Sequence, residues 1–151
     1  MPRTTTSKRR RLPSRRRFGT FGTTADVGIW ARAPHGDELF DALGVALFSV
    51  VTDLRKVRPR EERAVDASAD DPAGLAVAFL NALVILAGDG FLVRDVHARL
   101  LGQPPTSVLA AVRGEMFDPL RHVVKTEVKA VTLHQLEVDL ARGRARVILD
   151  I

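Results

Sequence analysis

Two aspartates in apolar stretches are the residues of this sequence best suited to chemistry. Asp26 stands in the stretch TADVGI (24–29), and Asp150 stands in ILDI (148–151) at the other end of the chain. A charge without a partner inside an apolar strand is unfavourable. Carboxylate oxygens are hard ligands that suit calcium, magnesium or manganese. If the two stretches meet, both aspartates and the chain-terminal carboxylate predict a divalent-cation site.

Two neighbouring features bear on this prediction. Gly28 lies two residues after Asp26, on the same face of an extended chain, so we expect an open space beside the carboxylate. Lys129, flanked by apolar residues in VKAVT (128–132), could neutralise the acids. From spacing alone a simpler interpretation stays open, in which both aspartates are exposed residues on the solvent face of their strands.

The sequence lacks the motifs that mark other kinds of functional site. The chain has no cysteine, and its four histidines show neither HxH nor HExxH spacing, which disfavours a zinc site. No GxSxG and no glycine-rich phosphate loop occurs, so the motifs do not indicate a hydrolase, kinase or dehydrogenase. A small metal-dependent phosphohydrolase would need a base and a positioned water, and the sequence offers no candidate for the base.

The charge is divided unevenly along the chain. Residues 1–17 hold eight of the 23 bases and no acid, which leaves 15 bases against 18 acids in residues 18–151. The first 17 residues are predicted to be a disordered basic tail, which could make weak contact with RNA. Residues 18–151 are predicted to form one domain. No apolar run is long enough to cross a bilayer, and no secretory signal is visible, so we expect a cytoplasmic protein without membrane contact.

Apolar periodicity predicts two main helices, at about 37–51 and 71–87, with an Asp-Pro start for the second. Alternation and turn residues predict extended segments elsewhere, with an irregular crossing over 114–122. The predicted segments are 18–33, 63–68, 91–101, 108–113, 123–133, 134–140 and 145–151. The predicted fold is α+β: a single domain with a mixed, mostly antiparallel sheet and both helices packed on one face.

Several motifs, taken in order, resemble those of the archease family. They are TADVGI (24–29), ELF (38–40), LN (80–81), GE (114–115), VKAVT (128–132) and the final DI (150–151). The resemblance covers everything except the basic tail. One position departs from the family pattern, because Thr23 stands where archeases usually carry the histidine of an HTAD motif.

The resemblance implies an α+β fold and a non-enzymatic role. Archeases assist the RtcB-type RNA ligase of tRNA splicing and RNA repair by promoting its guanylylation and its multiple turnover. The implied metal ligands are Asp26, Asp150 and the main chain of Ile151, with calcium as the cation and manganese or magnesium as alternatives. Lys129 is an implied functional residue, and His122 and Glu115 are further candidates. The alternative function is an RNA-binding chaperone acting through the basic tail.

Overall fold

The computed structural model describes residues 17–22 and 25–151, which form two α-helices, one 3-10 turn and seven strands. The helices are α1 (Gly36–Val51) and α2 (Pro72–Gly88), and the turn is η2 (Leu54–Lys56). The strands are β1 (Phe18–Gly22), β2 (Val27–Arg32), β3 (Glu61–Ser68), β4 (Phe91–Leu101), β5 (Ser107–Met116), β6 (Ala130–Asp139) and β7 (Arg144–Asp150).

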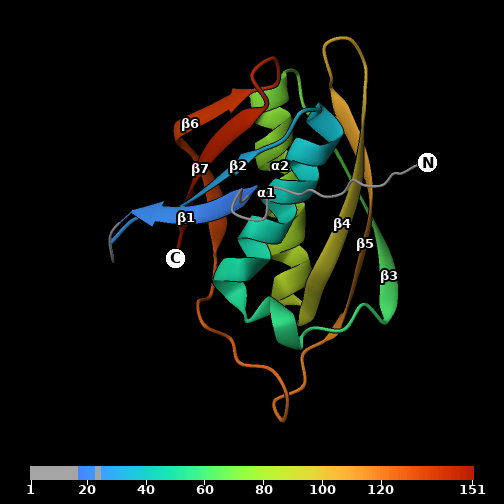
Figure 1. Cartoon of the computed structure of the whole chain (residues 1–151), viewed down its shortest axis with the longest axis vertical. Coiled ribbons are helices and arrows are strands. Elements are labelled where there is room, and N and C mark those ends of the chain that lie inside the picture. Colours follow the sequence, from blue (N-terminus) through green and yellow to red (C-terminus); the bar gives the residue numbers. More distant parts are fainter. Residues whose placement is uncertain (1–16, 23–24) are drawn as a thin grey trace, which may run out of the picture.

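The strands are divided between two antiparallel sheets. One has the order β1-β2-β7-β6, and the other has the order β3-β5-β4. The helices stand between them (Figure 1), and each helix contacts strands of both sheets. The predicted α+β class is therefore confirmed. The arrangement differs from the prediction in one respect, because two sheets enclose the helices where a single sheet was expected.

Both helices follow from their sequences. In α1 the apolar residues recur at helical spacing, and Leu39, Leu43 and Leu47 have no exposed surface. In α2 the Asp71 side chain accepts a hydrogen bond from the Gly74 N–H, so it caps the helix that Pro72 begins. Burial of these apolar faces between the two sheets forms one continuous core.

Two acids of α1 hold the helix against the edge strand β4. The Ala98 N–H donates to Asp41 at 2.6 Å, and the Leu100 N–H donates to Asp37 at 2.8 Å. Burial raises the pKa of the Asp41 carboxyl, and the hydrogen bond from Ala98 partly offsets this rise. The carboxylates thus satisfy main-chain groups that would otherwise be unpaired at a sheet edge.

The segment between β5 and β6 differs from the prediction. β5 continues to Met116, whereas residues 123–129, predicted as extended, lie outside the named strands apart from a bridge between Val124 and Thr52. The reason is topological: β5 and β6 belong to different sheets, so the chain has to cross from one to the other here.

The predicted tail, residues 1–17, lies outside the described residues apart from Arg17. The Arg17 carbonyl oxygen accepts a hydrogen bond of 2.8 Å from the Arg32 N–H, which extends the pairing of β1 with β2 by one step. Within the described ranges, no helix is long and apolar enough to cross a membrane.

The close approach of β4 to β5 at Gly114 leads to a prediction about stability. A Cβ atom on Gly114 would lie 1.8 Å from the Leu92 carbonyl oxygen, whereas one on Gly88 would meet nothing within 4 Å. We expect Gly114→Ala to lower the free energy of unfolding by about 1–3 kcal/mol because the backbone must move. Gly88→Ala is the matched control and should be neutral or slightly stabilising. Urea denaturation measures both, and an unchanged midpoint for Gly114→Ala would contradict this packing.

Candidate metal site

Pairing of β2 with β7 brings the two predicted aspartates to one place. The strands run antiparallel with Val27 opposite Leu149 and Gly28 opposite Ile148. One further step of this register sets Asp26, the residue before β2, opposite Asp150, the last residue of β7. Directly opposed residues of an antiparallel pair have Cβ atoms about 4.5–5.5 Å apart and share a face of the sheet. The two carboxylates therefore project from the same face.

That face is directed away from the core. Ile29 and Val147 are fully buried, and Leu149 is 2% exposed, so these alternate positions face the helices. Asp26 and Asp150 are both exposed. In the described part of the chain, neither carboxylate forms an ion pair with a base. Like charges placed directly opposite one another on a sheet are destabilising, and a bound cation would relieve this repulsion.

The start of β6 brings Lys129 and its main chain to the end of the sheet that carries Asp26 and Asp150. Ala130 lies opposite Asp150, and the Lys129 N–H donates to the Asp150 carbonyl oxygen at 2.8 Å. Asn81 of α2 fixes the start of β6: its Oδ1 accepts from the Val131 N–H at 2.9 Å, and its Nδ2 donates to the Val131 carbonyl at 3.4 Å.

Asn81 is a positioning residue for which the sequence analysis inferred no role. The available signal was a single amide side chain in the middle of an apolar helix. Such a side chain has to find hydrogen-bond partners when it is partly buried, and here it finds the main chain of β6 beside the acids.

The open space expected beside Asp26 is absent. Phe21 of β1 pairs with Gly28, and its ring covers the glycine so closely that a Cβ there would lie 2.3 Å from the Phe21 ring. Gly28 thus makes room for an aromatic ring from the neighbouring strand, and the prediction of a gap was wrong. The Arg146 guanidinium lies over the same ring, 4.3 Å from its centroid.

The donor set is small and consists of oxygen. In the predicted site Asp26 and Asp150 would supply carboxylates, and Ile151, which is half-buried against the core, would supply main-chain oxygen. Within residues 17–22 and 25–151, no group of three or more His, Cys, Asp or Glu side chains is placed to hold a metal ion. The predicted site thus has two side-chain ligands and leaves coordination positions for other oxygen atoms, since calcium takes six to eight.

Glu115 and His122 form a second polar cluster. The Glu115 carboxylate accepts hydrogen bonds from the Arg58 N–H at 2.8 Å, from the His122 Nε2 at 3.0 Å and from the Arg121 guanidinium. These donors, with the Arg121 hydrogen bond contributing most, lower the pKa of Glu115 to about 2, although its burial opposes them.

His122 is held in one orientation, with only 3% of the residue exposed. Its Nδ1 accepts from the Asp118 N–H at 2.9 Å, so the Nε2 carries the proton and faces Glu115 and the Lys56 carbonyl oxygen at 3.1 Å. Because both ring nitrogens form hydrogen bonds, His122 has a structural role: it restrains the conformation of the segment after β5.

The candidate residues therefore fall into two groups. Asp26, Asp150, Ile151 and Lys129 converge at the β2–β7 end, whereas Glu115 and His122 meet each other. Among the described residues no hydrogen bond or ion pair joins the two groups. Thr23, which replaces the family histidine, lies outside the described residues.

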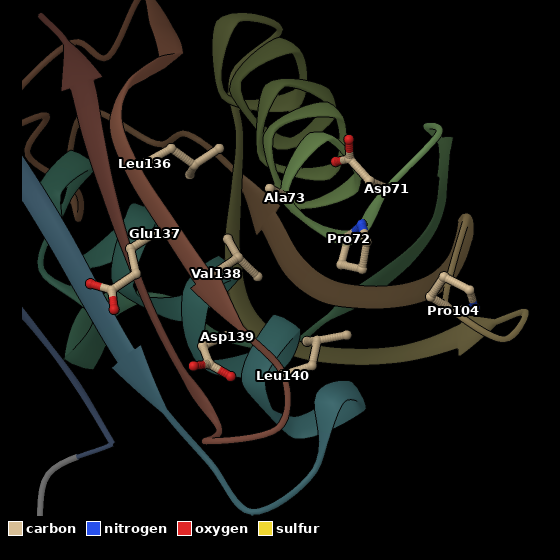
Figure 2. Close-up of a pocket in the computed structure, with 9 residues that line it drawn as sticks. All are labelled: Asp71, Pro72, Ala73, Pro104, Leu136, Glu137, Val138, Asp139 and Leu140. Carbon is tan, nitrogen blue, oxygen red and sulfur yellow. The ribbon is translucent and has the colours of Figure 1, made fainter.

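A shallow groove between α2 and β6 offers no comparable chemistry (Figure 2). Leu136, Val138 and Leu140 point toward it, and the Asp71 carboxylate at its rim already caps α2. None of the predicted site residues lines this groove.

The fold and the paired acids define a small α+β protein in which two antiparallel sheets enclose two helices. A family model described as "Archease protein family (MTH1598/TM1083)" matches residues 18–151. The protein archease of Thermococcus gammatolerans is 35% identical over 132 residues, covering 85% of this chain and 93% of that protein. The protein archease of Pyrococcus abyssi is 32% identical over 141 residues, covering 90% and 99%.

A solved structure agrees with these similarities. The solution structure of Methanobacterium thermoautotrophicum protein 1598 has a TM-score of 0.71 and 29% identity, with 89% of this chain and 99% of that chain covered. The chain belongs to the archease family. Archeases are generally known as non-catalytic accessory proteins.

The low pKa of Glu115 predicts a specific pH dependence. Because this carboxyl holds its proton less tightly in the folded state, its ionised form stabilises the fold above about pH 4.5. That contribution is lost as the pH falls toward about 2. Glu115→Gln should be less stable than wild type at pH 7, and the difference should shrink as the pH falls through this window. Urea denaturation across pH measures it, with the exposed Glu62→Gln as control. A difference that stays constant with pH would contradict the assignment.

Proposed function

We propose that this chain is a metal-binding activator of an RtcB-type RNA ligase. It would promote guanylylation of the ligase and its repeated turnover in tRNA splicing or RNA repair, and it would act in the cytoplasm. Family membership supports the accessory role. The observation that carries the proposal is the β2–β7 register, which sets Asp26 opposite Asp150 beside the main chain of Lys129.

The chemistry of the donor set fits a hard divalent cation. Two carboxylates and main-chain oxygen suit calcium, with manganese or magnesium as alternatives. The exposure of both aspartates leaves the pair accessible from outside the protein. A divalent cation bound there would supply charge to neutralise phosphoryl oxygens during nucleotide transfer.

The residues of this chain have separate roles in the proposal. Asp26 and Asp150 hold the cation and present it at the end of a rigid pair of strands. Lys129 is exposed, and its ammonium adds positive charge for an anionic group on the ligase or on its nucleotide. Asn81 keeps the main chain of β6 in place next to Asp150.

The alternative function is an RNA-binding chaperone that works through the basic tail. Its support is the eight bases, without any acid, in residues 1–17. The two functions place the essential residues at different ends of the sequence, so deletion and substitution separate them.

Metal binding should stabilise the folded state through the two aspartates. At a free calcium concentration ten times Kd, the expected stabilisation is about 1.4 kcal/mol, or a few degrees in Tm. Asp26→Asn or Asp150→Asn should remove most of this shift, whereas Asp66→Asn, an exposed aspartate on β3, should keep it. Thermal melts with calcium or manganese measure the shift. If millimolar metal leaves the wild-type Tm unchanged, these aspartates are not the site.

Activation of the ligase should depend on the acids and not on the tail. Under multiple-turnover conditions with GTP, the wild type and a chain lacking residues 1–16 should stimulate guanylylation of an RtcB-type ligase equally. Asp150→Asn should stimulate it much less, because the cation is lost, and Asp66→Asn should behave as wild type. The RNA-chaperone function requires the opposite pattern, with activity lost on deletion and kept in Asp150→Asn.

A further inference from the structure

The segment that follows β5 exposes a cluster of apolar side chains. Nine large hydrophobic side chains are exposed in the described residues, and five of them lie within residues 116–124. We call these five the apolar loop: Met116, Phe117, Leu120, Val123 and Val124. Leu120 is 93% exposed and Val123 is 64% exposed. In Figure 1 this segment projects beyond the helices and sheets at one end of the molecule. Clustered exposure of this kind marks an interaction surface.

The apolar loop is held in place from beneath by polar groups. His122 and Glu115 are buried and bonded to each other, and the Thr52 hydroxyl, also buried, donates to the Val123 carbonyl oxygen at 2.7 Å. The Lys125 N–H donates to the Val51 carbonyl oxygen at 2.7 Å, which ties the loop to the end of α1. Glu115 and His122 are thus buried while Leu120, Val123 and Val124 are exposed, an arrangement that folding alone does not favour.

Basic residues surround the apolar loop. Residues 55–60 (RKVRPR) lie beneath the apolar loop, where the Lys56 carbonyl oxygen contacts His122 and the Arg58 N–H donates to Glu115. Three of the six bases in segments 55–60 and 116–125 are paired with acids: Arg55 with Asp53, Arg60 with Glu115, and Arg121 with Glu115 and Asp118. The other three, Lys56, Arg58 and Lys125, are exposed and form no ion pair in the described part of the chain. The acids that flank these segments, Glu61 and Glu127, are exposed. A partner complementary to this surface would carry an apolar groove with an acidic rim.

The apolar loop and the paired aspartates lie within reach of one partner. Val124 is bridged to Thr52, and Ala130 lies opposite Asp150. Five residues lie between Val124 and Ala130, so the two points are at most about 22 Å apart. That distance fits within a protein interface of ordinary size.

Other kinds of partner fit less well. An anionic membrane would attract the bases, but it would repel the exposed carboxylates of Asp26 and Asp150. Single-stranded RNA is bound by stacking on aromatic rings, and four of the five residues of the apolar loop are aliphatic or Met. A protein groove accommodates both the aliphatic side chains and the basic surroundings.

We propose that the apolar loop is a docking element, which inserts into an acid-rimmed apolar groove on the RtcB-type ligase and so directs the Asp26–Asp150 site toward it. This inference rests on the proposed function. In this proposal, Leu120 and its neighbours contribute to the affinity for the ligase, whereas the two aspartates bind the cation.

The test is binding of the full-length chain to the RtcB-type ligase of the same genome, measured by titration calorimetry with calcium present. Leu120→Asp and Val123→Asp should each weaken binding by about tenfold or more, as expected at the centre of an interface. Both should keep the calcium-dependent Tm shift. Leu109→Asp is the matched control, because Leu109 is 54% exposed on β5, seven residues before Met116 and near the opposite end of that strand; it should bind within twofold of wild type. Thermal melts verify that each variant is folded.

The outcomes are distinguishable. Undiminished binding by Leu120→Asp, or equal weakening by Leu109→Asp, overturns the docking role. If the wild type still activates the ligase in that case, the proposed function stands. A wild type that neither binds nor activates the ligase overturns both. If Leu120→Asp abolishes sedimentation with phosphatidylserine vesicles and leaves ligase binding intact, the loop serves a membrane, and the proposal is wrong.

Discussion

The antiparallel pairing of β2 with β7 is the constraint on which the rest of the site depends. It joins a strand near the start of the sequence to its last strand, and burial of Ile29, Val147 and Leu149 against the helices fixes its register. A shift by one residue would turn these side chains to solvent and the acids toward the core. The same hydrophobic burial that stabilises the fold therefore holds Asp26 and Asp150 opposite each other.

The crossing between the two sheets depends on a different kind of interaction. Residues 117–129 belong to no named strand and have one isolated bridge, at Val124, so scattered main-chain bonds and side chains satisfy their polar groups. Glu115, His122 and Thr52 supply the side-chain bonds that are buried beneath the segment. These bonds hold the segment in one conformation, with Val128 its buried apolar anchor, and they leave Leu120, Val123 and Val124 exposed to a partner.

Much of this architecture was predictable because the relevant signals are local. The Asp71-Pro72 start of α2, the stripe of α1 and the alternation of β4 all specify elements that the structure contains. Acids in apolar strands at both ends of the chain indicated the meeting of Asp26 with Asp150. Other features that depend on contacts between distant residues could not be predicted from the sequence. The division into two sheets, the Phe21 ring over Gly28 and the bonds of Asn81 to β6 depend on residues far apart in sequence, and no single stretch encodes them.

The central claim is that Asp26 and Asp150 share one divalent cation at the end of the β2–β7 pair. Anomalous diffraction from crystals grown with manganese tests it most directly, because the ion itself is located. The account predicts an anomalous peak within about 2–2.6 Å of oxygen atoms from Asp26, Asp150 and the main chain of Ile151. A peak elsewhere on the protein, or none at saturating manganese with both carboxylates ordered, would contradict it.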